Sequence, residues 1–168
     1  MYKHFIVAVL CFLPLLAVAQ EFGYVNRAEI FQAMPETTEA MKKLDDLAKN
    51  YEAELLIMQE EYQKKGSEFV AQRDSLPESI RIRRMTDIQD LEQRIQGFYQ
   101  ESQEHIQRQQ QELIIPINDK LTKAVQAVGE ELNMVYIFDT SANMGLMYWS
   151  PSKCKDVTPL VRAKLGLK

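Results

Sequence analysis

Large hydrophobic residues recur every three or four positions through the middle of the chain, from Glu36 to Ile115. This spacing keeps one narrow stripe on a single face of a helix, as in a coiled coil. The first half of the stripe comprises Leu44, Ala48, Tyr51, Leu55, Met58, Tyr62 and Phe69, and the second half Met85, Ile88, Leu91, Ile95, Phe98, Ile106 and Leu113. Because Lys65, Gln72, Ser102 and Gln109 also fall on it, we expect a partly open seam between two helices.

The segment 74–79 interrupts the pattern with Pro77. Ser75 followed by Glu78 is typical of a capping box that opens a second helix. Folding the chain near residue 77 pairs positions whose numbers sum to about 154, so that Leu55 lies opposite Phe98 or Tyr99. The sequence therefore predicts a long antiparallel helical hairpin, the arm, over residues 36–115. Two helices of about 38 residues would make it about 57 Å long.

The segments that flank the arm predict a small body. Residues 22–25 are expected to form a strand, Asn26 and Glu29 a capping box for a short helix, and Pro35 the first turn of the arm. On the return, Pro116 is expected to kink or restart the helix, which then continues to Asn133.

Two more strands and a helix are expected toward the C-terminus. The continuous β-branched and aromatic run from Met134 to Asp139 favours a buried strand. Residues 145–149 are expected to form a hairpin with it, and a last short helix starts near Thr158. The predicted fold class is mainly α with a small β body (α+β), the body comprising residues 20–35 and 116–168.

Residues 1–19 have the features of a secretory signal peptide: Lys3, an apolar run from Phe5 to Val18, and a small-x-small site ending at Ala19. The run of about 14 residues is shorter than the roughly 20 that a membrane-spanning helix needs. We therefore expect a periplasmic protein that is soluble after cleavage.

Charge disfavours nucleic acid as a partner. The chain has 20 basic and 24 acidic residues, and loss of Lys3 leaves 19 against 24, a net charge of −5. Arg81, Arg83 and Arg84 cluster near the tip of the arm. A solvated helix face explains them more simply than an anion or lipid-headgroup site.

The expected body, under 70 residues, would have a thin core and open sheet edges. Cys154 is the one cysteine left after signal cleavage, so an intrachain disulfide is not expected and an unpaired thiol is favoured over a link between subunits. We therefore expect copies of the chain to assemble through the body sheet, which would cover the open sheet edges. The residues expected to carry this assembly are Tyr24, Val25, Phe31, Val135, Ile137 and Met147.

The order and spacing of these parts resemble the Skp/OmpH family of periplasmic chaperones. The resemblance rests on residues 23–26 leading into Ile30 and Phe31, the long hairpin, residues 135–139, and residues 156–158 before a closing helix. It implies a jellyfish-like homotrimer, whose arms surround a cavity and hold unfolded outer-membrane proteins without ATP. Studied members are strongly basic, whereas this chain is acidic, so the resemblance does not support a lipopolysaccharide or membrane-surface site here.

Catalysis is not expected, and neither is a cofactor or metal. His105 and Cys154 are the only histidine and cysteine after residue 19, too few for a Cys/His metal cluster. The single histidine falls on the polar arm, where a catalytic triad is not expected. Flexible or amphipathic side chains on the arm suit client binding instead. The candidates are Met41, Tyr51, Met58, Tyr62, Phe69, Met85, Phe98 and Tyr99. Packing of one arm helix on the other is the alternative role for each.

Three residues are candidate hinges: Gly66, Gly97 and Pro116. Each glycine lowers helix stability by about 1 kcal/mol relative to alanine. They would let the arm flex around clients of different size, or they would accommodate local packing. An alternative function for the whole chain is a structural or adaptor protein, whose hairpin docks on another coiled coil in an envelope complex.

Overall fold

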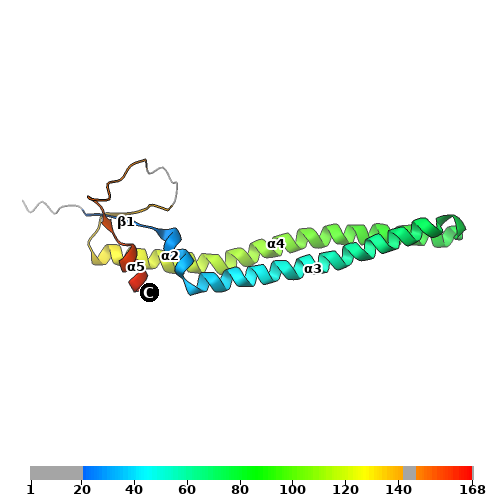
Figure 1. Ribbon diagram of the computed structural model, residues 1–168, viewed down its shortest axis with the longest axis horizontal. Helices are drawn as coiled ribbons and strands as arrows, with labels where there is room; N and C mark the ends of the chain where they lie inside the picture. Colours follow the sequence, from blue (N-terminus) through cyan, green and yellow to red (C-terminus); the bar gives the residue numbers. More distant parts are fainter. Residues whose placement is uncertain (1–20, 142–146, 168) are drawn as a thin grey trace, which may run out of the picture.

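The computed structural model describes residues 21–141 and 147–167. A small body lies at one end of a long two-helix arm (Figure 1). The elements are β1 (Phe22–Val25), α2 (Arg27–Ala33), α3 (Pro35–Gln72), a 3-10 turn (Arg73–Ser75), α4 (Glu78–Glu131), β2 (Tyr136–Asp139), β3 (Lys155–Asp156) and α5 (Thr158–Lys164). The predicted fold class, mainly helical with a small β body and a long hairpin, is confirmed.

The arm has the predicted antiparallel register. Contacts between α3 and α4 join Glu36 with Lys120 near the body and Gln72 with Arg84 near the tip. The 38 residues of α3 span about 57 Å at 1.5 Å per residue. The pairing sum of about 154 therefore holds along the whole arm.

The turn at the tip differs from the predicted capping box. Ser75 lies in the 3-10 turn, and its hydroxyl donates a hydrogen bond to the backbone oxygen of Gln72 at 2.8 Å. Helix α4 begins at Glu78 after Pro77, without a side-chain cap. Ser75 is thus used to end the first helix rather than to start the second, so the predicted role was wrong.

Helix α4 continues through Pro116 as one helix, so of the two expected effects, a kink or a restart, the restart was wrong. Proline cannot donate a hydrogen bond to the carbonyl of Glu112, but both residues are exposed, and water can satisfy that carbonyl. Just beyond the proline, Ile117 and Leu121 are buried in the body. This packing supports the helix on the body side of the proline.

Two predicted helix ends are confirmed. The Asn26 side chain accepts a hydrogen bond from the backbone N–H of Glu29 at 3.1 Å, which caps α2. At the end of α4, Asn133 has φ 51°, a left-handed conformation that asparagine adopts more readily than most residues. The chain therefore leaves α4 sharply and returns along the sheet.

The body sheet has the strand order β2-β1-β3, and both pairs are parallel. The expected hairpin between residues 134–139 and 145–149 was wrong: residues 147–149 are not in a strand, and residues 142–146 lie outside the described ones. Strand β1 occupies the centre instead. Each of its neighbours reaches it from a distant part of the chain, which a local sequence pattern cannot reveal.

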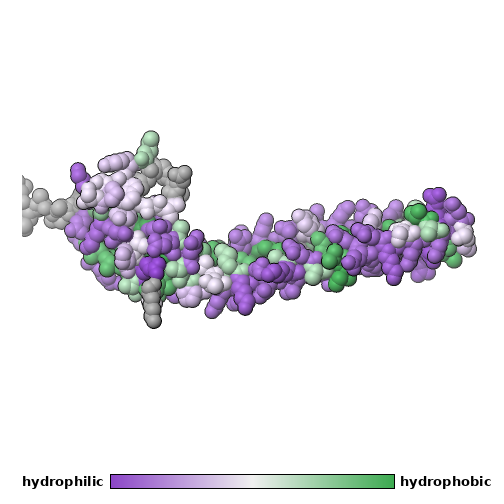
Figure 2. All heavy atoms as spheres, in the orientation of Figure 1, coloured by the Kyte–Doolittle hydropathy of each residue, from purple (hydrophilic) through white to green (hydrophobic). Residues whose placement is uncertain are grey.

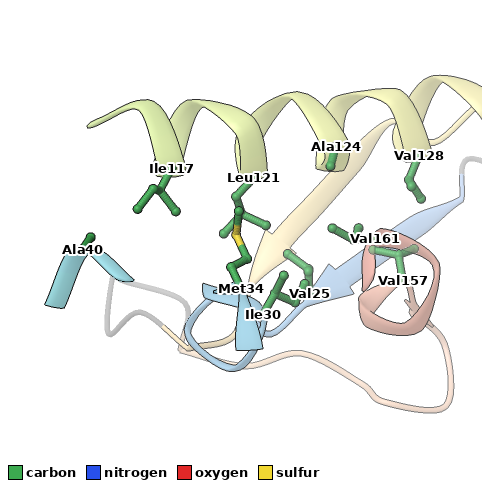
Figure 3. Packing of buried hydrophobic residues seen from close by; sticks show 10 residues of the cluster. All are labelled: Val25, Ile30, Met34, Ala40, Ile117, Leu121, Ala124, Val128, Val157 and Val161. Atoms are coloured by element: carbon green, nitrogen blue, oxygen red, sulfur yellow. The ribbon is translucent and has the colours of Figure 1, made fainter. Parts of the chain in front are cut away.

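One face of the sheet packs on helices. Figure 3 shows the core where β1 and α5 meet α2 and α4. Its buried members come from five elements and their flanking residues: Val25, Ile30, Met34, Ala40, Ile117, Leu121, Ala124, Val128, Val157 and Val161. Strand β2 is not buried as predicted, because Tyr136 is 61% exposed.

Candidate functional site

The arm leaves most of its surface in solvent, because two helices can bury only one stripe of each other. Within its seam, Leu91 and Ser102 are 2% and 4% exposed, while most of the other stripe residues are half-buried. Figure 2 shows hydrophilic residues over most of the arm, with separate hydrophobic groups between them. The arm thus presents apolar side chains on a largely polar frame.

The eight predicted client-contact residues fall into two groups. Five are half-buried at the seam: Tyr51, Met58, Tyr62, Phe69 and Phe98. Met41, Met85 and Tyr99 are 49%, 45% and 54% exposed. The first group is placed for packing one helix on the other, and the second group is free to contact a partner.

Aromatic residues join the two helices near the middle of the arm. The rings of Tyr51 and Phe98 meet edge to face, with centroids 5.7 Å apart. The Tyr51 hydroxyl also shares a hydrogen bond of 2.5 Å with Nδ1 of His105. His105 is therefore part of the seam between the two helices.

A groove of about 310 Å³ lies beside this cluster on one side of the arm. Ser102 occupies a seam position there and donates a hydrogen bond to the backbone oxygen of Phe98 at 2.6 Å. A serine is too small to fill the space that leucine or isoleucine would occupy. One of the predicted polar interruptions of the seam thus lies at this groove. The groove is lined by Ala48, Tyr51, Glu52, Leu55, Phe98, Tyr99, Ser102, Gln103 and Ile106.

Sequence reasoning missed six further apolar side chains on the arm that are at least 44% exposed: Leu56, Ile57, Val70, Ile80, Ile82 and Ile115. The signal was available, because each lies off the stripe of seam residues in a helix that has only one buried face. Together with Met41, Met85 and Tyr99 they make nine large exposed apolar residues within α3 and α4.

The two arm glycines have no close neighbours. A Cβ atom added at Gly66 or Gly97 would have nothing within 4 Å, apart from the adjoining residues and helix backbone. Packing against other parts of the chain therefore does not explain them. Their role as hinges stays a prediction.

The arginines near the tip are engaged in local interactions. Arg81 pairs with Glu78, and Arg84 donates a hydrogen bond to Gln72 Oε1 at 2.7 Å. Both interactions are typical of a solvated helix face.

At the base of the arm, Lys120 bonds to Glu36 across the two helices. This hydrogen bond from Lys120 is the main reason that the pKa of Glu36 lies below its ordinary value of 4.5. Leu113, Pro116 and Ile117 line a groove of about 310 Å³ beside the pair. The ion pair thus connects the two helices where they leave the body.

The second face of the body sheet carries aromatic side chains. The ring of Phe22 stacks with those of Tyr136 and Phe138, each at a centroid distance of 6.3 Å. Tyr24 contacts Trp149 at 4.2 Å. We call these five residues the aromatic face. Burial and the neighbouring Asp156 carboxylate raise the pKa of Tyr24 above its ordinary value.

The predicted assembly residues do not lie together on one surface of the body. Val25 is 1% exposed within the core, and Phe31 and Ile137 pack against that core. Tyr24 belongs to the aromatic face, while Val135 and Met147 are 45% and 99% exposed. Tyr148, which the sequence analysis did not single out, is 82% exposed.

A family model for OmpH-like outer membrane proteins matches residues 21–165 of the chain. The chain belongs to the OmpH-like family. This assignment confirms the resemblance drawn from the order of the sequence segments. No match was found among curated proteins.

A solved structure has the same fold as this OmpH-like chain. It is the crystal structure of a candidate outer membrane chaperone (OmpH-like) from Caulobacter crescentus CB15. The TM-score is 0.72 at 14% sequence identity, and the match covers 87% of this chain and 83% of that one. At this identity, the likeness concerns the fold alone.

The described part of the OmpH-like chain lacks two features. Over residues 21–141 and 147–167, no helix is long and apolar enough to cross a membrane. Within the same ranges, no three His, Cys, Asp or Glu residues are grouped so as to hold a metal ion. The predicted signal peptide lies outside the described residues.

Proposed function

We propose that the chain is a subunit of an ATP-independent periplasmic holdase. It binds unfolded outer-membrane protein precursors in a cavity between helical arms and prevents their aggregation. The observation that carries the proposal is that a long, solvated helical arm exposes large apolar side chains. Membership of the OmpH-like family and the fold shared with a candidate outer membrane chaperone support it.

The arm has the properties that holding an unfolded chain requires. Weak apolar contacts spread along a long frame add up when several engage one client. Each contact releases readily on its own, so the client can leave without an energy source. Methionine can adapt to varied partners because its side chain is flexible, and tyrosine can do so because its ring is amphipathic.

A homotrimer would create the cavity. Among the residues that the structure describes, no helix covers the aromatic face. Tyr136 on this face is highly exposed, and so are Met147 and Tyr148, which precede Trp149 in the chain. Three copies that pack these faces together would bury them and hold three arms side by side. The predicted signal peptide, residues 1–19, would direct the chain to the periplasm, and no catalytic step is part of the proposal.

Assembly is tested by solution mass of the mature protein. We expect three chains for the wild type and a lower mass after Tyr136→Ser. Leu160→Ser is the matched control, because Leu160 is also exposed, at 42%, but belongs to α5 rather than to the aromatic face. A wild-type monomer at micromolar concentration would contradict the trimer.

Holding is tested by diluting a urea-unfolded outer-membrane β-barrel protein into buffer without nucleotide. We expect the mature chain to suppress light scattering and to form a stable complex with about one client per assembly. Unchanged aggregation in the presence of excess folded protein would instead favour the structural or adaptor function, and the search would turn to a coiled-coil partner.

A further inference from the structure

The two long sides of the arm, left and right of its seam, differ in chemistry. The groove of about 310 Å³ in the middle of the arm identifies the residues of one side, because residues of both helices line it together. They are Glu52 of α3 and Tyr99, Gln103 and Ile106 of α4. A second groove, nearer the tip, fixes the other side through Glu68 of α3 and Asp87 of α4. Steps of three and four residues from these positions trace each side along its helix.

The first side is nearly free of charge between Leu56 and Val70 on α3 and between Ile82 and Ile106 on α4. Beyond these ranges, the charged residues Arg73 and Glu78 follow at the tip. We call this first side the neutral side. Continuing from Glu52 toward the tip, α3 contributes Leu56, Gln59, Gln63, Gly66 and Val70. From the groove toward the tip, α4 contributes Tyr99, Gln96, Glu92, Gln89, Met85 and Ile82. Glu92 is the one charged residue among these helical positions.

The opposite side is densely charged, and we call it the charged side. Continuing from Glu68 away from the tip, α3 contributes Lys64, Glu61, Ile57 and Glu54. From Asp87 and its neighbours, α4 contributes Ile80, Arg83, Asp90, Arg94, Glu101 and Glu104.

Electrostatic interactions across the helices support this assignment. The pKa of Glu61 is lowered first by its hydrogen bond to Lys65 and also by Arg94 on the other helix. Two helices thus place charges of both signs together on the charged side. Its ion pairs solubilise the arm.

We propose that the neutral side is the client-binding side of the arm, and that it binds uncharged stretches of unfolded polypeptide with alternating apolar side chains. This inference rests on the proposed holdase function and adds the side of the arm and the chemistry of the bound segment. The charged side remains in solvent.

The chemistry of the neutral side complements such a segment. Strands of an outer-membrane barrel alternate apolar and polar residues, and an unfolded strand has unpaired backbone N–H and C=O groups. Glutamine amides donate and accept hydrogen bonds, so Gln59, Gln63, Gln89 and Gln96 can pair with that backbone without burying a charge. Charged residues in these positions would lose hydration upon contact, which is unfavourable.

The apolar residues on the neutral side form two groups. By the register of the arm, Leu56 lies near Tyr99, and Val70 lies near Met85. Fourteen residues separate the groups on each helix, which is about 21 Å. An extended strand spans this distance in about six or seven residues, so one barrel strand can reach both groups.

The test compares two double variants of the mature protein. Leu56→Gln with Met85→Gln alters the neutral side, and Ile57→Gln with Ile80→Gln alters the charged side. The pairs are closely matched, since Leu56 and Ile57 are 56% and 59% exposed, and Met85 and Ile80 are 45% and 44% exposed. The Kd for a urea-unfolded, dye-labelled outer-membrane β-barrel protein is measured for each, together with solution mass.

We expect the neutral-side variant to bind about tenfold more weakly and the charged-side variant to bind within about twofold of the wild type. Wild-type binding should change less than about threefold between low and high salt, because charges are not at the contact. Equal effects of both variants, or a larger effect of the charged-side variant, would overturn the inference.

Other outcomes are also distinguishable. A wild-type protein that binds no client would refute the proposed function itself. If the neutral-side variant changes the solution mass and leaves the Kd unaltered, the neutral side packs against another copy of the arm, and the inference is wrong.

Discussion

Replacing Gly66 and Gly97 with alanine is expected to stabilise the arm. Both glycines lie inside long helices, and a methyl group at either position would meet nothing within 4 Å outside the adjoining helix backbone. Alanine restricts the unfolded chain and favours the helix by about 1 kcal/mol at each site.

The two effects should add. Gly97 lies opposite position 57 in the register of the arm, nine residues along α3 from Gly66, or about 13 Å. At this separation, mutational free energies are usually independent. The double variant should therefore gain about 2 kcal/mol, which slows amide exchange through local opening of the arm about thirtyfold.

Amide hydrogen exchange followed by mass spectrometry measures this effect on arm peptides, with body peptides as the internal control. Exchange that is unchanged or faster in the arm, at an unchanged solution mass, would refute the reasoning from open space and helix propensity. The same variant tests the hinge prediction. A stiffer arm that still captures large and small clients equally would show that flexing at these glycines is not needed.

Three further substitutions test the body and the connections between the arm helices. Gly23→Ala should lower the free energy of unfolding by about 1–2 kcal/mol in urea titrations, because its Cβ would lie 2.8 Å from Met134 Sδ; the loss should shrink in a Met134→Ala background. Tyr51→Phe removes the hydrogen bond to His105 and should destabilise the middle of the arm by about 1 kcal/mol in amide exchange, with less effect when His105→Phe is also present. The Glu36 carboxylate, paired with Lys120, contributes under about 1 kcal/mol to the free energy of unfolding above its unfolded-state pKa of about 4.5. In the wild type this contribution is lost as the pH falls through the lower folded-state pKa. Lys120→Gln should remove the contribution, and acid titration of unfolding checks this.

The arm could be predicted from sequence because its rules are local. The stripe of Leu44, Leu55, Leu91 and related residues sets the helix faces, and the break near Pro77 sets the register. The capping role of Ser75 was missed because one hydroxyl can serve either the helix before it or the helix after it. The hydroxyl bonds to the backbone of Gln72 at the end of the first helix instead of to the start of the second, and the sequence pattern does not distinguish these two partners.

Strand pairing could not be predicted in the same way. Strand β1 pairs in parallel with β2 and β3, and more than 100 residues separate it from either. The two-residue strand β3 has no periodicity to detect, whereas residues 145–149 had the composition of a strand. The division of the arm surface into a neutral side and a charged side was also missed, because neighbouring residues such as Leu56 and Ile57 differ in the direction they face rather than in residue type.

The incorrect prediction that β2 is buried bears on assembly. Its first three residues, Tyr136 to Phe138, place aromatic or apolar side chains on both faces, a pattern typical of a strand that is covered on both sides. In the single chain, helices cover the face of Ile137, while Tyr136 on the other face is 61% exposed. The strand therefore has the composition for more burial than one chain provides. In the proposed trimer the neighbouring copies would bury this exposed face. Burial of Tyr136 and the rest of the aromatic face would then be the contact that holds the three arms together.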